Sequence, residues 1–323
     1  MNSKKVAVFT TGGTISSVFD EKSNKIRLSL SGEELINQIK PHFSDVEIQL
    51  HEFSKIPGPF FTPEMGVDLS RRITDELKNE DVCGAVIVQG TDTIDEMSYL
   101  NSLIISSSKP VVFTGAMKSG NEFYVDAKGN LIGSISVVSN EKSKNKGVLV
   151  YFDEAINSPR DVEKYHANKM GAFVSPKGAL GEYLNGCITY HYEPIIDKSY
   201  TVDKLEEKVA LIKVCTGMDD LLIRTCTDNN YKGIVLEGFG AGNVPPSICD
   251  AIKDAIDNNI VVVIVSRCFD GQAMGVYDYP GGGARLHEMG VISGKSLSGQ
   301  KARIKLMVLL SISSDIEFIK NNI

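Results

Sequence analysis

Several short stretches of the sequence are continuously apolar and rich in β-branched residues. Their apolar positions run on without alternating with polar ones, which is typical of strands covered on both faces by helices. A parallel sheet between two layers of helices has such strands. The expected strands are 5–9, 84–88, 110–114, 147–152, 209–214, 233–238 and 261–266.

Amphipathic helical patterns fall between these strands and begin at capping signals. Ser31 with Glu34, and Thr93 with Glu96, have the spacing of capping boxes, and Thr62 stands before a proline that suits a first helical position. Because strands and helices alternate along the whole chain, the pattern predicts an α/β fold with a parallel sheet. The expected helices are 33–43, 64–80, 95–106, 244–259 and 298–313.

A polar stretch, 193–208, interrupts this alternation and contains a proline. It separates a longer set of strand–helix units from a shorter one. We therefore predict a larger N-terminal α/β domain over 1–195, a linker over 196–208 and a smaller C-terminal α/β domain over 209–323.

Composition and charge narrow the class of protein. The chain has 323 residues, a net charge of −7 and a pI of about 5.4, which argues against nucleic acid and anionic membrane as partners. No window of the sequence is long and apolar enough to span a membrane, and the N-terminus lacks the features of a signal peptide. The six scattered cysteines favour reduced thiols in the cytoplasm, and the dispersed histidines form no metal motif.

Candidate chemistry follows the predicted strands, since ligands of open parallel sheets bind at the carboxyl ends of strands. Threonine, aspartate, glycine or lysine residues follow four of them. None of these segments is a Walker loop, a GxGxxG fingerprint or a GxSxG elbow. The segments are 10–14, 89–93, 115–118 and 159–164.

These residue types suit an attack on a small polar substrate. Thr14 follows two glycines whose backbone N–H groups suit an oxyanion, and its hydroxyl becomes a nucleophile if a neighbour activates it. Thr91 and Asp92, at a helix N-terminus, suit a small zwitterion, and Lys164 would ease the deprotonation of a nearby threonine. The alternatives are a plain strand-to-loop turn at Gly13 and a solvated Lys164. The joint occurrence of these residues at successive strand ends favours a site.

The motifs that carry these residues resemble those of the bacterial-type L-asparaginases and glutaminase-asparaginases. The resemblance extends from end to end and rests on TGGTI (11–15), GTDTIDE (90–96), VVFTGAMK (111–118), RDVEK (160–164) and GFGAGN (238–243). It implies a homo-oligomer, dimer or tetramer, with sites between the N-terminal domain of one subunit and the C-terminal domain of its neighbour. It also implies a threonine acyl-enzyme, release of ammonia, and no metal or organic cofactor.

The resemblance assigns roles to matching positions. Thr14 matches the nucleophile, Thr91 and Lys164 match a second threonine with its lysine, and Asp92 matches the carboxylate that binds the substrate's α-amino group. Asn243 matches an asparagine that reaches the neighbouring subunit's site. The expected substrate-binding residues are Gly13, Gly58, Gly90, Ala116 and Asn243.

The sequence departs from the family's pattern at the positions that grip the substrate and activate the nucleophile. The family's loop tyrosine has no match before Tyr99, which lies in a predicted helix, and Gly58 stands where a serine usually holds the substrate α-carboxylate. Gln89 replaces a usual histidine, and the glutamate of the neighbouring C-terminal domain has no clear match. Candidate replacements are Ser16, Ser17, Asp20, Glu21 and Lys25 for the tyrosine, and Tyr277, Asp278 and Tyr279 for the glutamate.

The sequence leads to one principal hypothesis and one alternative. The principal hypothesis is hydrolysis of the side-chain amide of L-asparagine, or of a closely related small amide, to the acid and ammonia. The alternative is a non-catalytic or partner-dependent protein that binds a small amino acid on the same scaffold. A nucleotide-binding function is the weakest interpretation, since no phosphate loop is present.

Overall fold

A computed structural model describes residues 4–13, 17–20, 23, 25–28, 31–118 and 125–323. The chain divides into two compact units, Met1–Thr201 and Val202–Ile323, and each is described by itself below. The predicted domain boundaries at 195 and 209 lie on either side of this division and stay predictions.

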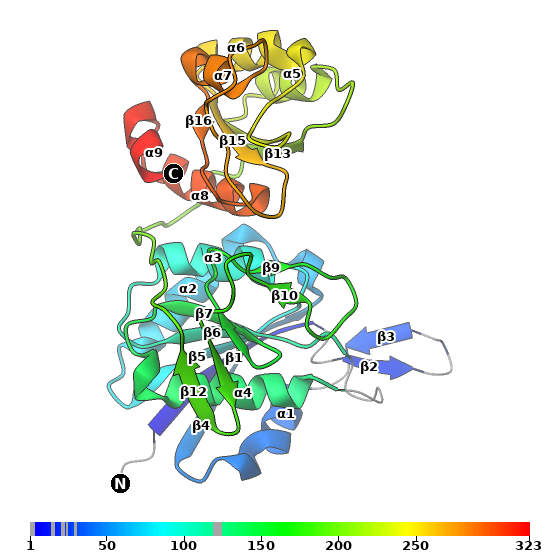
Figure 1. Ribbon diagram of the computed structural model, residues 1–323. Helices are drawn as coiled ribbons and strands as arrows, with labels where there is room; N and C mark the ends of the chain where they lie inside the picture. Colours follow the sequence, from blue (N-terminus) through cyan, green and yellow to red (C-terminus); the bar gives the residue numbers. More distant parts are fainter. Residues whose placement is uncertain (1–3, 14–16, 21–22, 24, 29–30, 119–124) are drawn as a thin grey trace. The chain divides into compact units, whose positions relative to one another are not determined.

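The first unit is built on an eight-stranded sheet with the order β12-β11-β8-β7-β6-β5-β1-β4 (Figure 1). Five neighbouring strands of this sheet, β4, β1, β5, β6 and β7, run parallel to one another. Beyond β7, the strands β8, β11 and β12 each pair antiparallel with their neighbours. The parallel strands are β1 (Lys4–Gly12), β4 (Val46–Ile56), β5 (Val82–Val88), β6 (Val111–Thr114) and β7 (Val148–Phe152). The antiparallel ones are β8 (Ala155–Asn157), β11 (Gly181–Leu184) and β12 (Cys187–Tyr190), and two small pairs stand apart, β2 (Ser17–Asp20) with β3 (Lys25–Leu28) and β9 (Glu163–Lys164) with β10 (Phe173–Val174).

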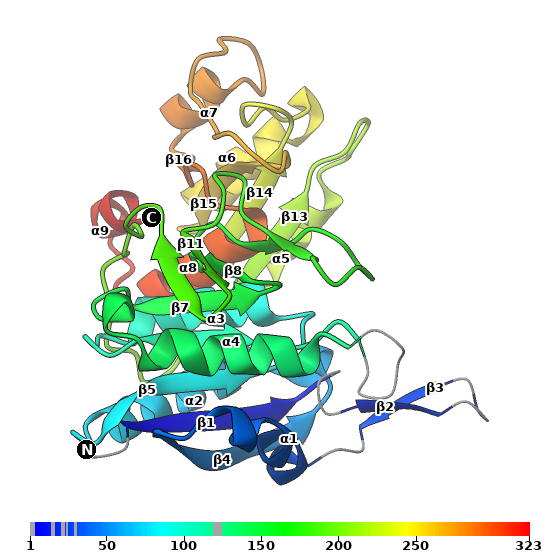
Figure 2. The ribbon, with the colours of Figure 1, turned by 60° about the horizontal axis from the view of Figure 1, so that its bottom comes forward.

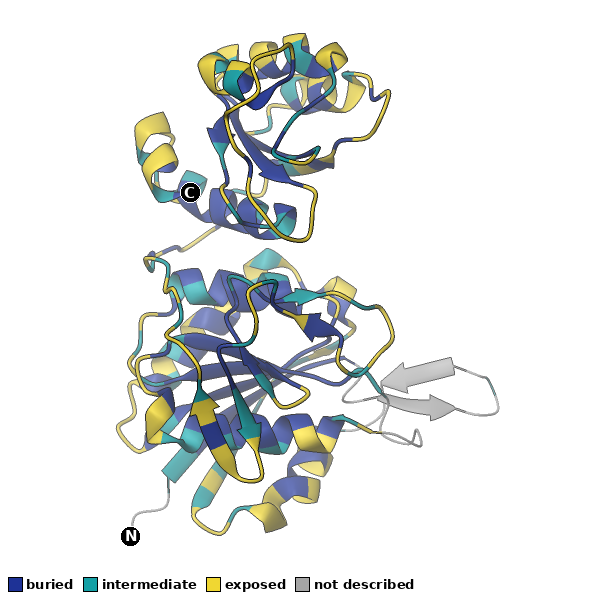
Figure 3. Cartoon of the chain, viewed as in Figure 1, coloured by how far each residue is buried: buried dark blue, intermediate teal, exposed yellow. Residues whose placement is uncertain are grey.

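Helices cover both faces of this sheet, as Figures 1 and 2 show. Helices α1 (Gly32–Ile39) and α4 (Ala127–Ser139) pack on one face, and α2 (Pro63–Leu77) and α3 (Ile94–Ile104) pack on the other. The central strands β1, β5, β6 and β7 are buried almost throughout (Figure 3). This burial on two faces explains their continuous apolar sequences and confirms the predicted α/β fold. Short 3-10 turns occur at Lys40–His42, Gly58–Phe60 and Glu141–Ser143.

Two of the three predicted helix caps are confirmed. Ser31 and Glu34 form the expected capping box, and the Thr62 side chain accepts a hydrogen bond from Met65 N. Thr93 stands at the N-cap of α3, but its side chain makes no capping hydrogen bond. Its hydroxyl accepts instead from Gln89 Nε2 at 2.9 Å, so the predicted capping box at Thr93 is wrong.

Strand β4 is the longest strand that the hydrophobic pattern missed. Its side chains are intermediate or exposed rather than buried, because it lies at the edge of the sheet and pairs with β1 alone among the described strands. The pairing continues to Gly12, opposite Ile56. The strand therefore delivers the Gly58 turn to the carboxyl end of β1.

The second unit holds a four-stranded parallel sheet with the order β13-β14-β15-β16. Helices α5 and α6 pack on one face and α8 on the other (Figure 1). No helix in the described part of the chain is long and apolar enough to cross a membrane. The strands are β13 (Val209–Lys213), β14 (Gly233–Gly238), β15 (Val261–Ser266) and β16 (Ile292–Ser293), and the helices are α5 (Leu221–Asp228), α6 (Cys249–Asp257) after a 3-10 turn at Pro246–Ile248, α7 (Gly283–Met289), α8 (Gly299–Ile312) and α9 (Ile316–Asn322).

Candidate active site

Glycines from separate turns pack backbone to backbone at the carboxyl ends of β1, β4 and β5. Gly13 has a φ of 87°, and a Cβ atom on it would lie 2.3 Å from Gly90 Cα. A Cβ atom on Gly90 would in turn lie 2.9 Å from Gly58 Cα. We call Gly13, Gly58 and Gly90 the glycine stack. Real Cβ atoms do not approach other atoms so closely, so Gly13 and Gly90 have no room for a side chain.

Thr11 fastens the turn that carries Gly13. Its hydroxyl donates to Val88 O at 3.2 Å, and its carbonyl accepts from Ser54 Oγ at 2.9 Å. These hydrogen bonds join the ends of β1, β4 and β5. The threonine that precedes the glycines thus supports the turn.

Thr91, Asp92 and Lys164 come together beside the glycine stack. Lys164 Nζ donates to Thr91 Oγ1 at 2.9 Å and to Asp92 Oδ1 at 2.6 Å. Thr91 is buried and the Lys164 side chain is 16% exposed, whereas the Asp92 side chain is 58% exposed. The cation therefore lies against a buried hydroxyl oxygen, and the aspartate keeps an open side for a cationic ligand.

Gln89 is buried just before this cluster, at the position of the family's usual histidine. Its Nε2 donates to Thr93 Oγ1 at 2.9 Å, and Thr93 Oγ1 donates to Gly58 O at 3.5 Å. Gln89 Oε1 has no hydrogen-bond partner among the described residues. The glutamine thus links the end of β5 to the Gly58 turn, and this tertiary link displaces the predicted helix cap.

The turn that contains Ala116 is held by residues that sequence reasoning missed. Asp126 accepts from Met117 N at 2.8 Å and from Lys118 N at 3.1 Å, and Asn130 Nδ2 donates to Gly115 O at 3.0 Å. Burial raises the pKa of the Asp126 carboxyl, and the backbone N–H donors oppose part of that rise. Ala116 is fully buried. Asp126 and Asn130 belong to no sequence motif, so the hydrogen bonds by which they hold this turn become visible only in the structure.

Gly115 joins the Ala116 turn to the rest of the site. A Cβ atom on it would lie 2.4 Å from Gln89 O and 3.4 Å from Thr91 Cγ2. The structure thus brings together, at one edge of the sheet, seven of the predicted site residues. They are Gly13, Gly58, Gly90, Thr91, Asp92, Ala116 and Lys164. Their roles in binding and catalysis stay predictions.

The remaining predicted residues fall elsewhere. Thr14 lies outside the described residues, and the candidate side chains of the loop 16–32 are not described either. Asn243 belongs to the second unit, where its Oδ1 accepts from Gly283 N at 3.3 Å. Tyr277 and Tyr279 in the same unit are each 45% exposed, with ring centroids 5.8 Å apart. Tyr99 is fully buried in α3 and is no loop tyrosine, as predicted.

Comparison with known families assigns both halves of the chain. The family model described as Asparaginase, N-terminal matches residues 5–196, and the one described as Glutaminase/Asparaginase C-terminal domain matches residues 208–322. These matches define the protein, an α/β chain with a lysine-paired threonine at its strand ends, as an amidohydrolase. It belongs to the asparaginase family and is asparaginase-like, with its substrate unspecified.

Individual relatives agree with this assignment. An L-asparaginase of Bacillus licheniformis is 32% identical over 310 residues, which are 95% of this chain and 96% of that protein. A glutamyl-tRNA(Gln) amidotransferase subunit of Methanococcus maripaludis is 30% identical over 95% of this chain and 76% of that protein. The crystal structure of a probable cytoplasmic L-asparaginase from Campylobacter jejuni has a TM-score of 0.88 at 29% identity and covers 99% of this chain and 98% of that one.

Proposed function

We propose that this protein hydrolyses the side-chain amide of L-asparagine to aspartate and ammonia through a threonine acyl-enzyme. The observation that carries the proposal is the hydrogen bonding of Lys164 Nζ to both Thr91 Oγ1 and Asp92 Oδ1. In an asparaginase-family chain this cluster supplies a hydroxyl next to a cation, and a carboxylate for the substrate's ammonium group. The substrate is held over the glycine stack, where backbone atoms alone form the surface.

The reaction has two steps. In the first, the Thr14 hydroxyl oxygen bonds to the amide carbon and its proton passes to the nitrogen. The carbon–nitrogen bond then breaks, ammonia leaves, and an ester joins the substrate to Thr14. In the second step water attacks the ester carbon, the proton of the water returns to the threonine oxygen, and aspartate leaves. Thr14 takes this role on the ground of its sequence position.

Thr91 and Lys164 move protons in this scheme. Because the Thr91 oxygen accepts a hydrogen bond from Lys164, its own hydrogen remains available for donation toward the substrate. Lys164 stabilises negative charge that develops on Thr91 Oγ1, and Asp92 offsets the positive charge of the lysine. A hydroxyl beside a buried cation is a better acid and a better nucleophile than one in water.

We also propose that the active form is a homo-oligomer in the cytoplasm. Family membership supports an assembly in which Asn243 of one subunit reaches the site of the next. The similarity to a probable cytoplasmic L-asparaginase supports the compartment. All six cysteines are free, which suits a reducing environment.

The test is ammonia release from L-asparagine, D-asparagine, L-glutamine and simple ω-amides. We expect turnover of L-asparagine that disappears in Thr14→Ala and falls strongly in Thr91→Val. The matched control is Thr225→Val, since Thr225 is exposed on α5 and hydrogen-bonds to Leu221 O in its own helix. The measurement assigns the reaction class and the nucleophile together.

The second candidate function is partner-dependent or non-catalytic binding of a small amino acid. The similarity to a subunit of a glutamyl-tRNA(Gln) amidotransferase favours it. It predicts no ammonia release by the isolated chain, together with a raised melting temperature in the presence of asparagine or glutamine. That result would replace the hydrolase proposal.

A further inference from the structure

We propose that Arg160, Asp197 and Tyr99 form a buried positioning network that holds Lys164 against Thr91 and Asp92. This inference rests on the proposed function, in which Lys164 and Thr91 move protons. It assigns a role to residues that touch no reacting atom. They act through the segments that carry the reacting side chains.

Tyr99 and Arg160 both hydrogen-bond to the carboxylate of Asp197. Tyr99 Oη donates to Asp197 Oδ2 at 3.0 Å, and Arg160 Nη1 donates to Asp197 Oδ1 at 3.3 Å and Oδ2 at 3.1 Å. Tyr99 is fully buried, and the Arg160 and Asp197 side chains are 15% and 14% exposed. Burial, and then the charge of Asp197, raise the pKa of the Tyr99 hydroxyl well above its usual value, so Tyr99 remains a donor at neutral pH.

Two of these residues lie on the segments that form the site. Tyr99 is in α3, the helix that begins directly after Thr91 and Asp92. Arg160 is in the turn that leads to Lys164, where Arg160 N donates to Ser158 Oγ at 3.2 Å. Asp197 thus bridges the two segments whose side chains meet at the Lys164–Thr91 hydrogen bond, which joins residues 73 positions apart.

The turn between Arg160 and Lys164 transmits this constraint. Val162 N donates to Ser158 O at 2.9 Å, and the Val162 side chain is fully buried. The next residues, β9, pair with β10 through Lys164 opposite Phe173. A displacement of Arg160 therefore shifts the start of the short strand that carries Lys164.

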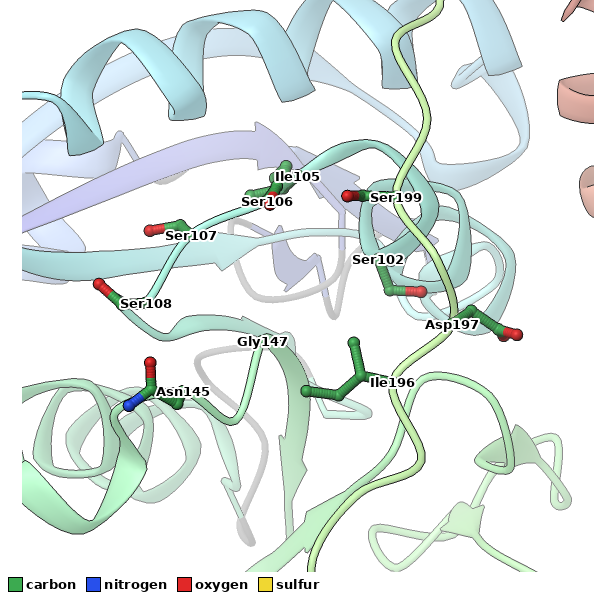
Figure 4. A pocket seen from close by; sticks show the side chains of 10 residues that line it. All are labelled: Ser102, Ile105, Ser106, Ser107, Ser108, Asn145, Gly147, Ile196, Asp197 and Ser199. Atoms are coloured by element: carbon green, nitrogen blue, oxygen red, sulfur yellow. The ribbon is translucent and has the colours of Figure 1, made fainter.

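Asp197 is itself held at the edge of a surface pocket. Figure 4 shows Asp197 and Ile196 on a segment that passes α3 beside Ser102, next to a pocket of about 320 Å³. Ile196 is 58% exposed, so the segment is packed on one side only. On that side Asp197 contacts Arg160 and Tyr99, and Tyr200 N donates to Leu103 O at 2.7 Å. The network therefore also fixes the segment that leaves the first unit.

A purely structural role is the competing explanation. Buried ion pairs often add little to stability in comparison with apolar residues of the same size, but they do specify one arrangement. A positioning role predicts changes at Lys164 itself, whereas a structural role predicts only a lower stability of the whole unit. Chemical labelling of Lys164 separates the two.

The principal variant is Tyr99→Phe, which removes one hydroxyl and keeps the ring. Its matched control is Tyr183→Phe, which removes a hydroxyl that hydrogen-bonds Ser136 elsewhere in the same unit. A second pair is Arg160→Met and Arg160→Lys, where lysine keeps the charge. Each protein is assayed for kcat and KM with L-asparagine. Each is also labelled at its lysines with acetic anhydride, with Lys164 measured by mass spectrometry against exposed Lys78.

We expect Tyr99→Phe to lower kcat at least about threefold and Arg160→Met to lower it about 10–100-fold, since small misplacements of reacting groups cost rates of this size. KM should change little, Arg160→Lys should restore part of kcat, and Lys164 should label severalfold faster in Tyr99→Phe and Arg160→Met. Tyr183→Phe should match the wild type. If Arg160→Met does not fold, Tyr99→Phe decides the question.

Unchanged labelling of Lys164 in folded Tyr99→Phe overturns the inference, whether or not kcat falls. A wild type that releases no ammonia from any amide removes the proposed hydrolase function instead. In that case faster labelling of Lys164 in the variants still supports the network. The two failures are therefore distinguishable.

Discussion

Gly58 is the position of the glycine stack that has room for a side chain. A Cβ atom there would lie 3.4 Å from Asp92 Cβ and 3.5 Å from Gly90 O, which are ordinary contact distances. The φ angle of Gly58 is also not positive, so a residue with a side chain can adopt its backbone conformation. Gly58→Ser is therefore expected to fold like the wild type and to place a hydroxyl next to Asp92. In the proposed site, that hydroxyl would reach the substrate's α-carboxylate.

The expected gain follows from one added hydrogen bond to a charged group. Such a bond contributes about 1.5–3 kcal/mol, which corresponds to a KM lower by about 10–150-fold. Because the α-carboxylate does not change during the reaction, the bond stabilises substrate and transition state alike. The variant should therefore lower KM and leave kcat near the wild-type value.

The assay is steady-state ammonia release by the wild type, Gly58→Ser and Gly58→Ala. Alanine fills the same Cβ position without a hydroxyl, so it measures the effect of volume alone. A second substrate, 3-aminopropanamide, is asparagine without its carboxylate and should gain nothing from the serine. Equal KM values for Gly58→Ser and Gly58→Ala, or an equal gain for 3-aminopropanamide, would refute the placement of the carboxylate at Gly58.

Further predictions concern the same site and the stability of its surroundings. Lys164→Met should lower kcat about 10²–10⁴-fold, which is the range for general acid–base groups. The control Lys177→Met, which removes an exposed ion pair, should leave kcat unchanged. Retention of half the wild-type kcat by Lys164→Met would contradict the proposed role. Gly13→Ala should lower the free energy of unfolding in urea by at least about 2 kcal/mol, and Gly129→Ala, with open space on a helix, should raise it by up to about 1 kcal/mol; equal effects would refute the packing argument. Burial raises the pKa of Tyr190 to about 12, so its stabilising contribution, present below pH 10, should be lost as pH rises through 12; the 295 nm titration of the wild type minus Tyr190→Phe should be centred near 12, and a centre at 10 would contradict it.

The sequence predicted the buried parallel strands because burial on two faces leaves a continuous apolar run. It missed β4, whose half-exposed side chains at the sheet edge carry neither a continuous nor a cleanly alternating pattern. The missed edge strand matters, since it brings Gly58 to the site. Edge position is a property of the whole sheet, so no local pattern contains it.

The site was predictable in part for a related reason. The sequence pattern alone predicted which polar residues follow the strands, and the family resemblance indicated which of these residues lie close together. Local capping rules failed at Thr93, because Gln89 and the Gly58 carbonyl compete for its hydroxyl from other turns. Tyr99 and Asp197 have no motif at all. Their interaction becomes visible only when distant segments are seen together.

The glycine stack also bears on the order in which the chain folds. Its turns come from separate strands, and the hydrogen bond that fastens them, from Thr11 to Val88, spans 77 residues. Contacts of such sequence separation form only after the entropy of closing a long loop has been lost, which slows folding. The surface proposed to receive the substrate is therefore incomplete in a partly paired sheet. Recovery of ligand binding during refolding should coincide with the slowest phase of β-sheet formation, so binding reports on completion of the fold.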